Sequence, residues 1–370
     1  MKKNYKYNSE QLEEVIAKQF DFSHCVLTGR ATSAFTAIFD VLFNKNDRII
    51  FPAIICPQPV VSAKIANLTP VIIDVQKHNG IIDIEKVKNA LERDKKIKAI
   101  VFVELFGQQK EKNLQKLILL AKKHQVFLIR DCAQSLPVQK YDSDFTILSF
   151  GHTKILDCGH AGAVLTNNKH HSNSLRKKIQ SFKKFNRDSF YKNSLLYRQK
   201  FYSIKKKQLN DNDETKCLNQ LLINQTDFYN LVFCDNYIDS LYLKLLKANH
   251  IIEKRRELSH LYYNALIDKD LKVITNPYDD VPWRFSILLR NNNLQKSITS
   301  KLRAHNFHAS NWYESVIKYF RHEDVITYEI PKNSLNFEQR VLNLWIDDST
   351  SIEYTNDCIN FLVKTLDMEI

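Results

Sequence analysis

The sequence predicts an α/β protein in which helices cover both faces of a mostly parallel sheet, with a smaller α+β unit after it. Short apolar runs alternate with amphipathic helical segments through the first half of the 370 residues. Strands buried on both faces have this character, and helical crossovers make them parallel. A long helical segment and a less regular set of elements follow. We therefore expect a large α/β domain over residues 1–240 and a small α+β domain over residues 241–370.

Five apolar runs in the first half predict strands, and the segments between them have apolar residues at helical spacing. Pro52 ends one strand, and Asp83 is a suitable N-cap for one helix. The predicted order is strand 25–27, helix 32–43, strand 48–51, helix 59–66, strand 71–75, helix 83–93, strand 99–103, helix 114–124 and strand 126–129. Two further apolar runs flank Lys154 and predict a strand, a turn and a second strand.

The second half of the chain is less regular. Residues 182–227 are polar and basic, and predict irregular and helical excursions from the sheet. Apolar residues at helical spacing predict one long helix over 235–266, which would link the two domains. The remaining elements are expected as a strand at 285–289, a helix at 294–305, a strand at 341–344 and a terminal helix at 352–366.

Bulk composition excludes several classes of protein. No apolar run is long enough to span a bilayer, and the first residues lack the apolar core of a signal peptide, so we expect a cytoplasmic protein without a membrane segment. The seven cysteines include no Cys-x-x-Cys pair, which argues against zinc and a disulfide framework, and we expect no metal. The net charge of +13 would suit nucleic acid, but no nucleic-acid-binding motif is present. A basic surface would equally attract an anionic small substrate.

The segment around Lys154 is the most informative part of the chain. An apolar run ends in Ser149-Phe150-Gly151, a single lysine follows in a turn, and a glycine-spaced stretch leads into the next strand. Desolvation at the end of a buried strand lowers the pKa of a lysine, which can then attack an aldehyde. Taken alone, the same pattern also suits a solvated turn lysine.

Other segments supply the partners that a lysine needs if its aldehyde is pyridoxal 5'-phosphate (PLP). Asp131 follows a strand and could hold the pyridinium proton, although a turn-capping role is an equal alternative. Thr32 and Ser33 stand at a helix N-terminus, where phosphate binds well, but an ordinary N-cap would look the same. Ser149 could add a hydroxyl. All these residues follow strands, so they should meet at the carboxyl edge of the sheet.

Five segments, in order, resemble the DegT/DnrJ/EryC1/StrS family of PLP-dependent sugar aminotransferases, which have the fold-type I architecture. The similarity runs over residues 11–366. The matching segments are Arg30–Phe35 with Ser-Gly-Thr-Ala-Ala-Leu, Leu68–Val75 with Gly-Ala-Thr-Pro-Val-Phe-Val-Asp-Val, Val103–Gln108 with Val-His-Leu-Tyr-Gly-Gln, Arg130–Ser135 with Glu-Asp-Ala-Ala-Gln-Ala, and Ser149–Lys154 with Ser-Phe-x-x-x-Lys.

The resemblance implies a role for each matching position. Lys154 would form the Schiff base with PLP and move the proton, and Asp131 would pair with the pyridine nitrogen. The other implied cofactor residues are Gln134 at the 3-oxygen and Thr32, Ser33 and Ser149 at the phosphate. Asn230 would reach the phosphate of the partner subunit in a homodimer, and Trp312 and Tyr313 would lie near the substrate.

The chain also departs from the family's pattern. Cys56 stands where an aromatic residue usually covers the cofactor ring, and Glu104 and Trp312 replace histidines. His160 and Ala161 replace part of a Gly-Glu-Gly-Gly run. The cofactor half therefore matches better than the substrate half.

The resemblance implies transfer of an amino group from L-glutamate or L-glutamine to a keto group, chiefly of a nucleotide-linked sugar, in surface-polysaccharide or secondary-metabolite biosynthesis. Three alternatives stay open. One is a PLP-dependent sugar dehydratase, whose lysine is replaced by histidine in those relatives; here His152 lies close to Lys154. The others are an aminotransferase acting on a phosphorylated non-sugar ketone and a non-catalytic regulatory protein of this fold.

Overall fold

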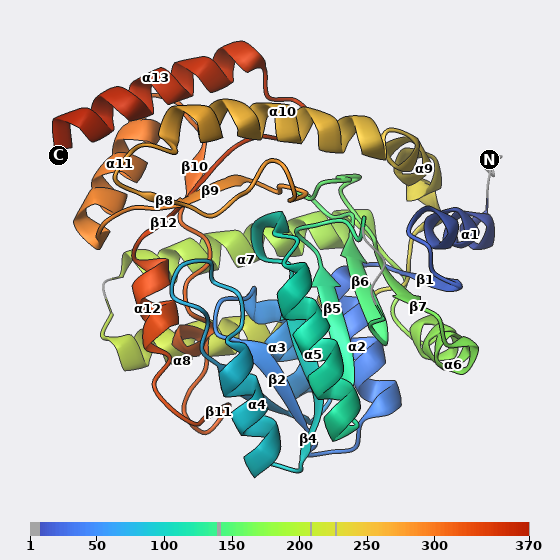
Figure 1. Cartoon of the computed structure of the whole chain (residues 1–370). Coiled ribbons are helices and arrows are strands. Elements are labelled where there is room, and N and C mark those ends of the chain that lie inside the picture. The colour runs from blue at the N-terminus through green and yellow to red at the C-terminus, as the bar shows by residue number, and fades with distance from the viewer. Residues whose placement is uncertain (1–7, 139–141, 208, 226–227, 370) are drawn as a thin grey trace.

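The computed structural model describes residues 8–138, 142–207, 209–225 and 228–369, and its main feature is a large mixed sheet (Figure 1). The strand order is β1-β7-β6-β5-β4-β2-β3-β11, in which all pairs from β6 to β11 are parallel. Only β7 runs antiparallel to its neighbours. The strands are β1 (His24–Thr28), β2 (Arg48–Pro52), β3 (Thr69–Ile73), β4 (Ile97–Val103), β5 (Phe127–Cys132), β6 (Phe145–Ser149), β7 (Gly162–Thr166) and β11 (Ile326–Thr327). The predicted, mostly parallel sheet is confirmed.

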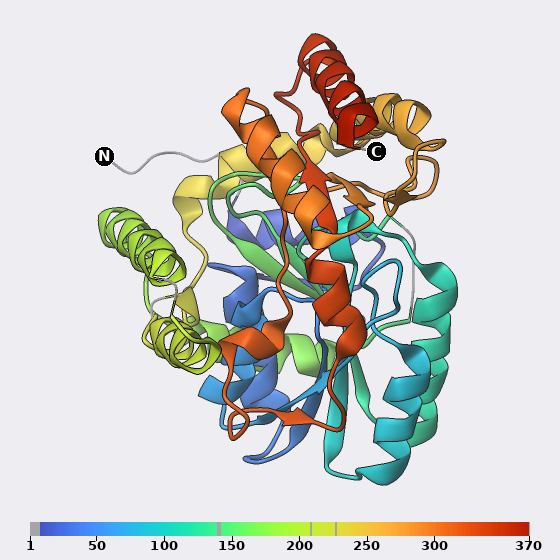
Figure 2. The same ribbon diagram turned by 90° about the vertical axis from the view of Figure 1, so that its left-hand side faces the viewer.

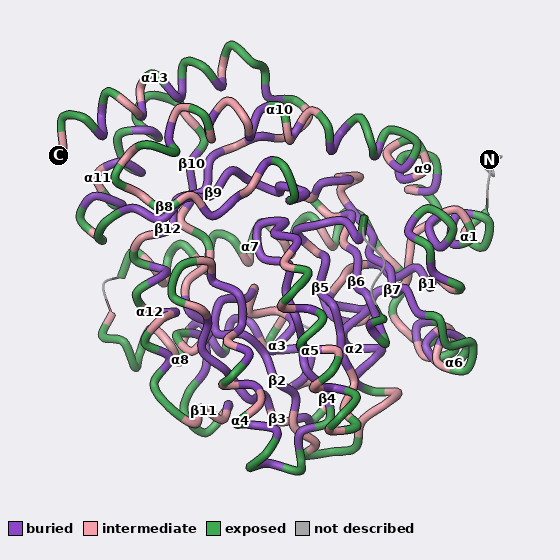
Figure 3. Tube along the Cα trace, in the orientation of Figure 1, coloured by how far each residue is buried: buried purple, intermediate pink, exposed green. Residues whose placement is uncertain are grey.

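Helices cover both faces of this sheet, which explains why its strands are apolar throughout. In Figure 1, α4 (Ile84–Arg93) and α5 (Glu111–His124) lie in front of the sheet, and α2 (Ala31–Leu42) and α3 (Pro57–Ile65) lie behind it. Two more helices, α1 (Ser9–Gln19) and α6 (Lys169–Gln180), pack at the β1 end. Figure 3 shows the central strands buried and the outer turns of the helices exposed.

The smaller unit is an antiparallel sheet of four short strands, with helices packed on it (Figure 2). Its strands run in the order β10 (Ala309–Ser310), β12 (Val341–Leu344), β9 (Phe285–Leu288) and β8 (Lys272–Val273). Its helices are α10 (Ala248–Leu266), α11 (Asn292–Ala304) and α13 (Ile352–Glu369). The division at residue 240 stays a proposal. Along α10 the packing passes from the core of the large sheet, which includes Ile252, to a second core, which includes Leu258.

The expectation of one continuous helix over 235–266 is wrong. The segment consists of a 3-10 turn (η3, Asp235–Tyr237), α9 (Ile238–Leu246) and α10, with a break at Lys247. The two helices pack on different partners, α9 against α1 and α10 against α13. The spacing of apolar residues along the sequence does not show such a change in the direction of the chain. The irregular stretch before it contains two helices, α7 (Arg187–Lys206) and α8 (Asp211–Ile223).

Backbone contacts fix the smaller unit against the carboxyl ends of the parallel strands. The short 3-10 helix after β4 (η1, Leu105–Gly107) accepts hydrogen bonds from the segment before β9. Val281 N–H donates to the carbonyl of Gly107 (3.0 Å), and Trp283 N–H donates to that of Phe106 (3.1 Å). Gly107 has a φ of +88°, and a Cβ there would lie 1.9 Å from the Val281 oxygen, so only glycine fits. The turn thus sets where β9 meets the sheet edge.

The remaining elements complete this contact. A 3-10 turn (η4, Val316–Tyr319) and α12 (Lys332–Glu338) descend from the smaller unit, and Val316 N–H donates to the carbonyl of Ala53 at 2.7 Å. In the described ranges no helix is both long and apolar enough to cross a membrane, and no group of three or more His, Cys, Asp or Glu residues could hold a metal ion.

Candidate active site

Lys154 lies in a tight turn between β6 and β7 that several hydrogen bonds hold in place. Asp157 accepts the backbone N–H groups of Thr153 (2.7 Å) and Gly159 (2.8 Å). The indole N–H of Trp283 donates to the Thr153 carbonyl at 2.6 Å, so the smaller unit also fixes the turn. Thr153 has a φ of +67°, in the left-handed region that β-branched residues avoid. Strain of this kind persists only where surrounding contacts over-determine the backbone.

The electrostatic surroundings of Lys154 suit a reactive amine. Burial lowers the pKa of its amine, and this outweighs the upward influence of Cys56 and Asp131. Two further cations, Arg30 and Arg284, push the pKa in the same downward direction as burial. Nζ lies 5.9 Å from the Trp283 ring centroid. Lys154 is half-buried rather than exposed, and with its lowered pKa this geometry favours the reactive lysine over a solvated turn lysine.

Asp131 lies near the carboxyl end of β5, close enough to Lys154 for their charges to interact. Its carboxylate accepts the backbone N–H of Ala133 at 2.9 Å. Burial is the main influence and raises the pKa of Asp131 to about 6, while the Ala133 bond and Lys154 oppose the rise. A carboxylate held this far from water is ready for a cationic N–H partner.

Because of this raised pKa, we expect the cofactor-free protein to become less stable to unfolding as the pH rises. Because the folded-state pKa of Asp131 exceeds the unfolded value, the stability it contributes is full below about pH 4 and is lost as the pH rises through about 6. Relative to Asp131→Asn, wild type should therefore lose about 2 kcal/mol between pH 4 and pH 7. Urea unfolding of both proteins across this range measures the gap. A gap that does not change with pH would show that Asp131 titrates normally.

Two departures from the family's pattern form one buried ion pair beside Asp131. Glu104 replaces the histidine of the motif after β4, and Arg130 replaces the glutamate before Asp131. Arg130 Nε donates to Glu104 Oε1 at 2.6 Å, and Gln109 Nε2 donates to Oε2 at 2.7 Å. Each substitution supplies the partner that the other requires. In the sequence alone they look like two unrelated losses.

Breaking this pair should destabilise the fold strongly. Arg130→Met leaves the Glu104 carboxylate buried without its cation, which typically costs about 3–5 kcal/mol. The double variant Glu104→Gln/Arg130→Met removes both charges and should recover more than half of that loss. Urea unfolding of the two variants measures the difference. A single variant that loses less than about 1 kcal/mol would mean that the pair contributes nothing beyond a surface contact.

Thr32 and Ser33 lie in the first turn of α2, beside the segment 228–231. The Thr32 hydroxyl donates to the Phe228 carbonyl (2.6 Å), and the Ser33 hydroxyl accepts the Leu231 N–H (3.0 Å). No side chain of the N-cap residue, Arg30, caps the helix. The start of α2 therefore keeps the uncapped geometry in which helix N–H groups bind anions. The Thr32 hydrogen is already used, whereas Ser33 keeps its own.

Close backbone approach holds this end of α2 against β7. A Cβ on Gly162 would lie 2.4 Å from the Ala31 nitrogen, so glycine is required there. Ser149 pairs with Gly162 across β6 and β7, which brings its side chain to the same edge. Asn230 follows on the segment that covers α2, and its Oδ1 is buried without a hydrogen-bond partner in the described residues. An orphaned polar atom of this kind indicates a missing ligand or partner.

Cys56 is the N-cap of α3, and its thiol has charge interactions with Lys154, Asp131 and Arg30. Burial raises its pKa, so it is a neutral thiol at pH 7. It thus occupies the centre of the group of predicted residues, but offers no aromatic ring.

Gln134 links the 3-10 helix after β4 to Tyr313 through two hydrogen bonds. Its Oε1 accepts the Phe106 N–H, and its Nε2 donates to the Tyr313 hydroxyl, both at 2.8 Å. The Tyr313 pKa is raised well above its usual range, chiefly by burial. Trp312 stacks on Tyr313 with ring centroids 5.7 Å apart, but it is 48% exposed. Of this pair, only Tyr313 reaches the predicted site residues.

Trp283 and Arg284 belong to the site but were not expected from the sequence. The Arg284 guanidinium lies between the rings of Trp283 (4.7 Å) and Trp345 (3.9 Å), is 1% exposed, and acts on the charge of Lys154. Burial, followed by Arg255, lowers its pKa to about 9. Nothing near residue 283 in the sequence indicates that it reaches a turn 130 positions away.

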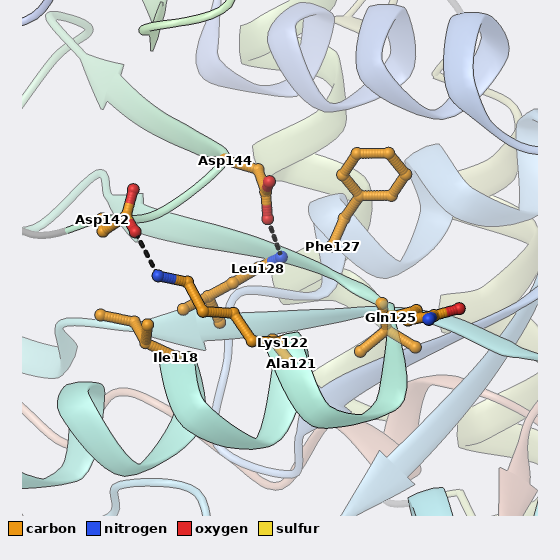
Figure 4. A pocket seen from close by; sticks show the side chains of 9 residues that line it. Ile118, Ala121, Lys122, Gln125, Phe127, Leu128, Asp142 and Asp144 are labelled. Atoms are coloured by element: carbon orange, nitrogen blue, oxygen red, sulfur yellow. Dashed lines mark hydrogen bonds and ion pairs between the residues drawn. The ribbon is translucent and has the colours of Figure 1, made fainter.

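A separate pocket lies between α5 and β5 at the other edge of the sheet (Figure 4). It is lined by residues that include Lys122, Asp142 and Asp144, and by none of the predicted site residues. Asp144 accepts the Leu128 N–H at 2.8 Å there, in the same way as Asp131 accepts a backbone N–H at the carboxyl edge.

The residues at the carboxyl edge fit PLP. They provide an amine of lowered pKa, a buried carboxylate, and an uncapped helix start with hydroxyls beside it. Cys56 and Asp131 each lie close enough to act on the charges of both Lys154 and Tyr313. These are the groups that the aldehyde, pyridine nitrogen and phosphate of PLP require.

Comparison with known proteins agrees with this fit. The chain is 27% identical over 157 residues to the L-glutamine:2-deoxy-scyllo-inosose aminotransferase of Micromonospora echinospora, a match covering 40% of this chain and 36% of the relative. It is 24% identical over 168 residues to the GDP-perosamine synthase of Escherichia coli O157:H7, covering 43% and 45%. The match therefore spans less than half the length of these curated relatives.

Solved structures show the same fold over nearly the whole chain. Helicobacter pylori PseC, an aminotransferase involved in the biosynthesis of pseudoaminic acid, has a TM-score of 0.76 at 18% identity, covering 98% of this chain and 92% of that one. NtdA from Bacillus subtilis, with bound cofactor PMP, has a TM-score of 0.76 at 18% identity, covering 97% and 77%. The model of one family matches residues 3–207, more than half of the 370. The chain therefore belongs to the DegT/DnrJ/EryC1/StrS aminotransferase family.

Proposed function

We propose that this protein is a PLP-dependent aminotransferase that moves an amino group from L-glutamate or L-glutamine to a keto group of a nucleotide-linked sugar. The observation that carries the proposal is the meeting of Lys154, Asp131 and the uncapped start of α2 at one sheet edge. The names of the curated relatives support a cyclitol or sugar acceptor. A cytoplasmic homodimer in surface-polysaccharide or secondary-metabolite biosynthesis completes the proposal.

Each residue at the site has a task that follows from its surroundings. PLP, when bound, supplies an aldehyde that exchanges amino groups and a ring that withdraws electrons. Lys154 Nζ can take up and return a proton, because its lowered pKa leaves more of it neutral near pH 7. Asp131 holds a proton on a ring nitrogen by its buried negative charge. The hydrogen bond from Gln134 to the Tyr313 hydroxyl fixes both side chains, so that they can orient a bound ligand.

The site favours transamination over sugar dehydration. The dehydratase alternative places a histidine at the position of the lysine, and here that position is Lys154. His152 does not replace it, because its side chain is 79% exposed and lies 3.3 Å from Asp157. The smaller unit also holds the turn next to Lys154 through the hydrogen bond from Trp283 to Thr153.

Mass spectrometry of the acceptor product tests this proposal. The PLP-loaded protein is incubated with L-glutamate and a set of nucleotide-linked keto-sugars, and the products are analysed for the exchange of a carbonyl oxygen for an amino group. Formation of an amino sugar with one equivalent of 2-oxoglutarate supports the proposal. A deoxygenated sugar would instead identify a dehydratase, and amination of phosphorylated non-sugar ketones alone would move the acceptor to that class.

A further inference from the structure

Arg30 lies at the start of α2, but its side chain does not cap the helix. It stands where the family's motif has a serine, and its side chain makes no capping bond to α2. The guanidinium lies over the rings of Phe190 (5.3 Å) and Phe228 (4.7 Å) instead. Stacking of this kind occupies the faces of a guanidinium, while its N–H donors lie in its plane. The rings therefore fix the group and leave its donors for another partner.

No carboxylate neutralises Arg30 among the residues that the structure describes. Burial lowers the pKa of its guanidinium, and the groups that oppose this are Tyr229, Cys56 and Tyr197. Burial raises the pKa of all three, so they are neutral at pH 7. Arg30 is half-buried, and a cation removed from water without a counter-charge is costly unless a ligand supplies one.

A second cation, Lys154, lies close to Arg30. Arg30 and Lys154 are close enough for Arg30 to lower the pKa of the lysine. The ring nitrogens of the buried His160 have no hydrogen-bond partner among the described residues. Burial and then Arg30 lower the pKa of His160 to about 3, so it is neutral at pH 7 and supplies no counter-charge. A group with two negative charges between Arg30 and the start of α2 would relieve this repulsion.

The hydroxyls of the loop do not meet this need by themselves. Thr32 uses its hydrogen on the Phe228 carbonyl, and Ser33 already accepts from Leu231. A phosphate dianion requires several donors, and a guanidinium offers two in the parallel geometry that phosphate oxygens accept. The segment 228–231 thus binds the hydroxyls, and its Phe228 ring positions the arginine.

We propose that Arg30 is a ligand of the cofactor phosphate, so that this chain uses a stacked guanidinium where the family's motif has a serine. The inference rests on the proposed function for the identity of the cofactor. It adds a charge-assisted contact that the motif does not contain, from a side chain on the same chain as Lys154.

Binding of PLP and of pyridoxal to the cofactor-free protein tests the assignment. The two compounds share the aldehyde and the ring, so changes at Lys154 or Asp131 affect both, and only the phosphate distinguishes them. Their dissociation constants are measured by fluorescence titration without an amino donor. In wild type, pyridoxal should bind far more weakly than PLP. Arg30→Met should narrow the ratio of the two constants by about tenfold to a hundredfold, since bonds to charged groups are the strong ones.

Arg187→Met is the matched control, because Arg187 also stacks on a ring, that of Tyr191 at 5.6 Å. It should leave the ratio unchanged. Arg30→Gln provides a second variant if Arg30→Met does not fold, and it should narrow the ratio by about tenfold for the same reason. If either Arg30 variant lowers the unfolding temperature while the ratio keeps its wild-type value, Arg30 only holds the aromatic rings and the assignment is overturned.

The same titration separates this inference from the proposed function. The ratio of the two dissociation constants is measured without any reaction, so it does not depend on whether the protein transfers amino groups. A failure to transaminate would instead be detected by mass spectrometry of the acceptor product. Wild-type protein that binds pyridoxal as tightly as PLP would overturn the Arg30 assignment directly.

Discussion

Replacing Lys154 with alanine is expected to lower the rate of amino transfer roughly a thousandfold or more, the scale on which a nucleophile and a general acid–base group act. The substitution removes the amine whose pKa is lowered by burial at the centre of the site. It leaves the turn intact, because that turn is held by Asp157 and Trp283 rather than by the lysine side chain. Single-turnover absorbance of the PLP-loaded variant with L-glutamate measures the rate.

Two controls separate chemistry from folding. Lys178→Ala removes a lysine that pairs with Asp40 at 2.8 Å on the outside of α6, and should keep the wild-type rate. Added methylamine should partly restore Lys154→Ala, since it supplies a small primary amine to the space left by the side chain. A Lys154→Ala protein that retains more than a tenth of the wild-type rate would remove Lys154 from the reaction.

Asp131→Asn is expected to have the second largest effect, a fall in turnover of roughly a hundredfold to a thousandfold. Asparagine has nearly the same shape and can still accept the Ala133 N–H, but it carries no charge. The negative charge that would hold a proton on the pyridine nitrogen is lost, and with it the electron-withdrawing power of the ring. Steady-state rates at matched cofactor loading measure the effect.

Asp144→Asn is the matched control for this change. Asp144 is also a carboxylate whose pKa is raised chiefly by burial, and it also accepts one backbone N–H, at the opposite edge of the sheet (Figure 4). The Asp144→Asn variant should at most be less stable than wild type, and its turnover rate should be unchanged. Equal losses of turnover in the two variants would mean that Asp131 acts only through the fold.

The residues proposed for the chemistry could be placed at one edge of the sheet from the sequence, because their signals are local. A strand followed at once by a polar residue places that residue at the carboxyl edge of a parallel sheet. Asp131 and Ser149 belong to β5 and β6 themselves, and Lys154 lies in the turn after β6. Alternation of strands and helices therefore predicted both the sheet and the edge at which these residues meet.

Contacts between segments that lie far apart in the sequence could not be predicted from local patterns. Trp283 reaches the Lys154 turn only because Gly107 fixes the segment before β9 against the sheet. Glu104 stood out in the sequence as a departure from the family's pattern, but only the pairing of β4 with β5 showed that Arg130 is its partner. The break at Lys247 followed from the different partners of α9 and α10. In each case tertiary packing decided what spacing alone could not.

The absorbance spectrum of the PLP-loaded protein, before and after the addition of L-glutamate, tests the central claim most directly. It requires no knowledge of the acceptor, because the first half of transamination needs only the amino donor. We predict a visible band of bound PLP that disappears with glutamate, is replaced by the shorter-wavelength band of the pyridoxamine form, and yields one equivalent of 2-oxoglutarate per site. A visible band that neither L-glutamate nor L-glutamine alters would contradict the proposed donor half-reaction, and the absence of any band would contradict the cofactor site itself.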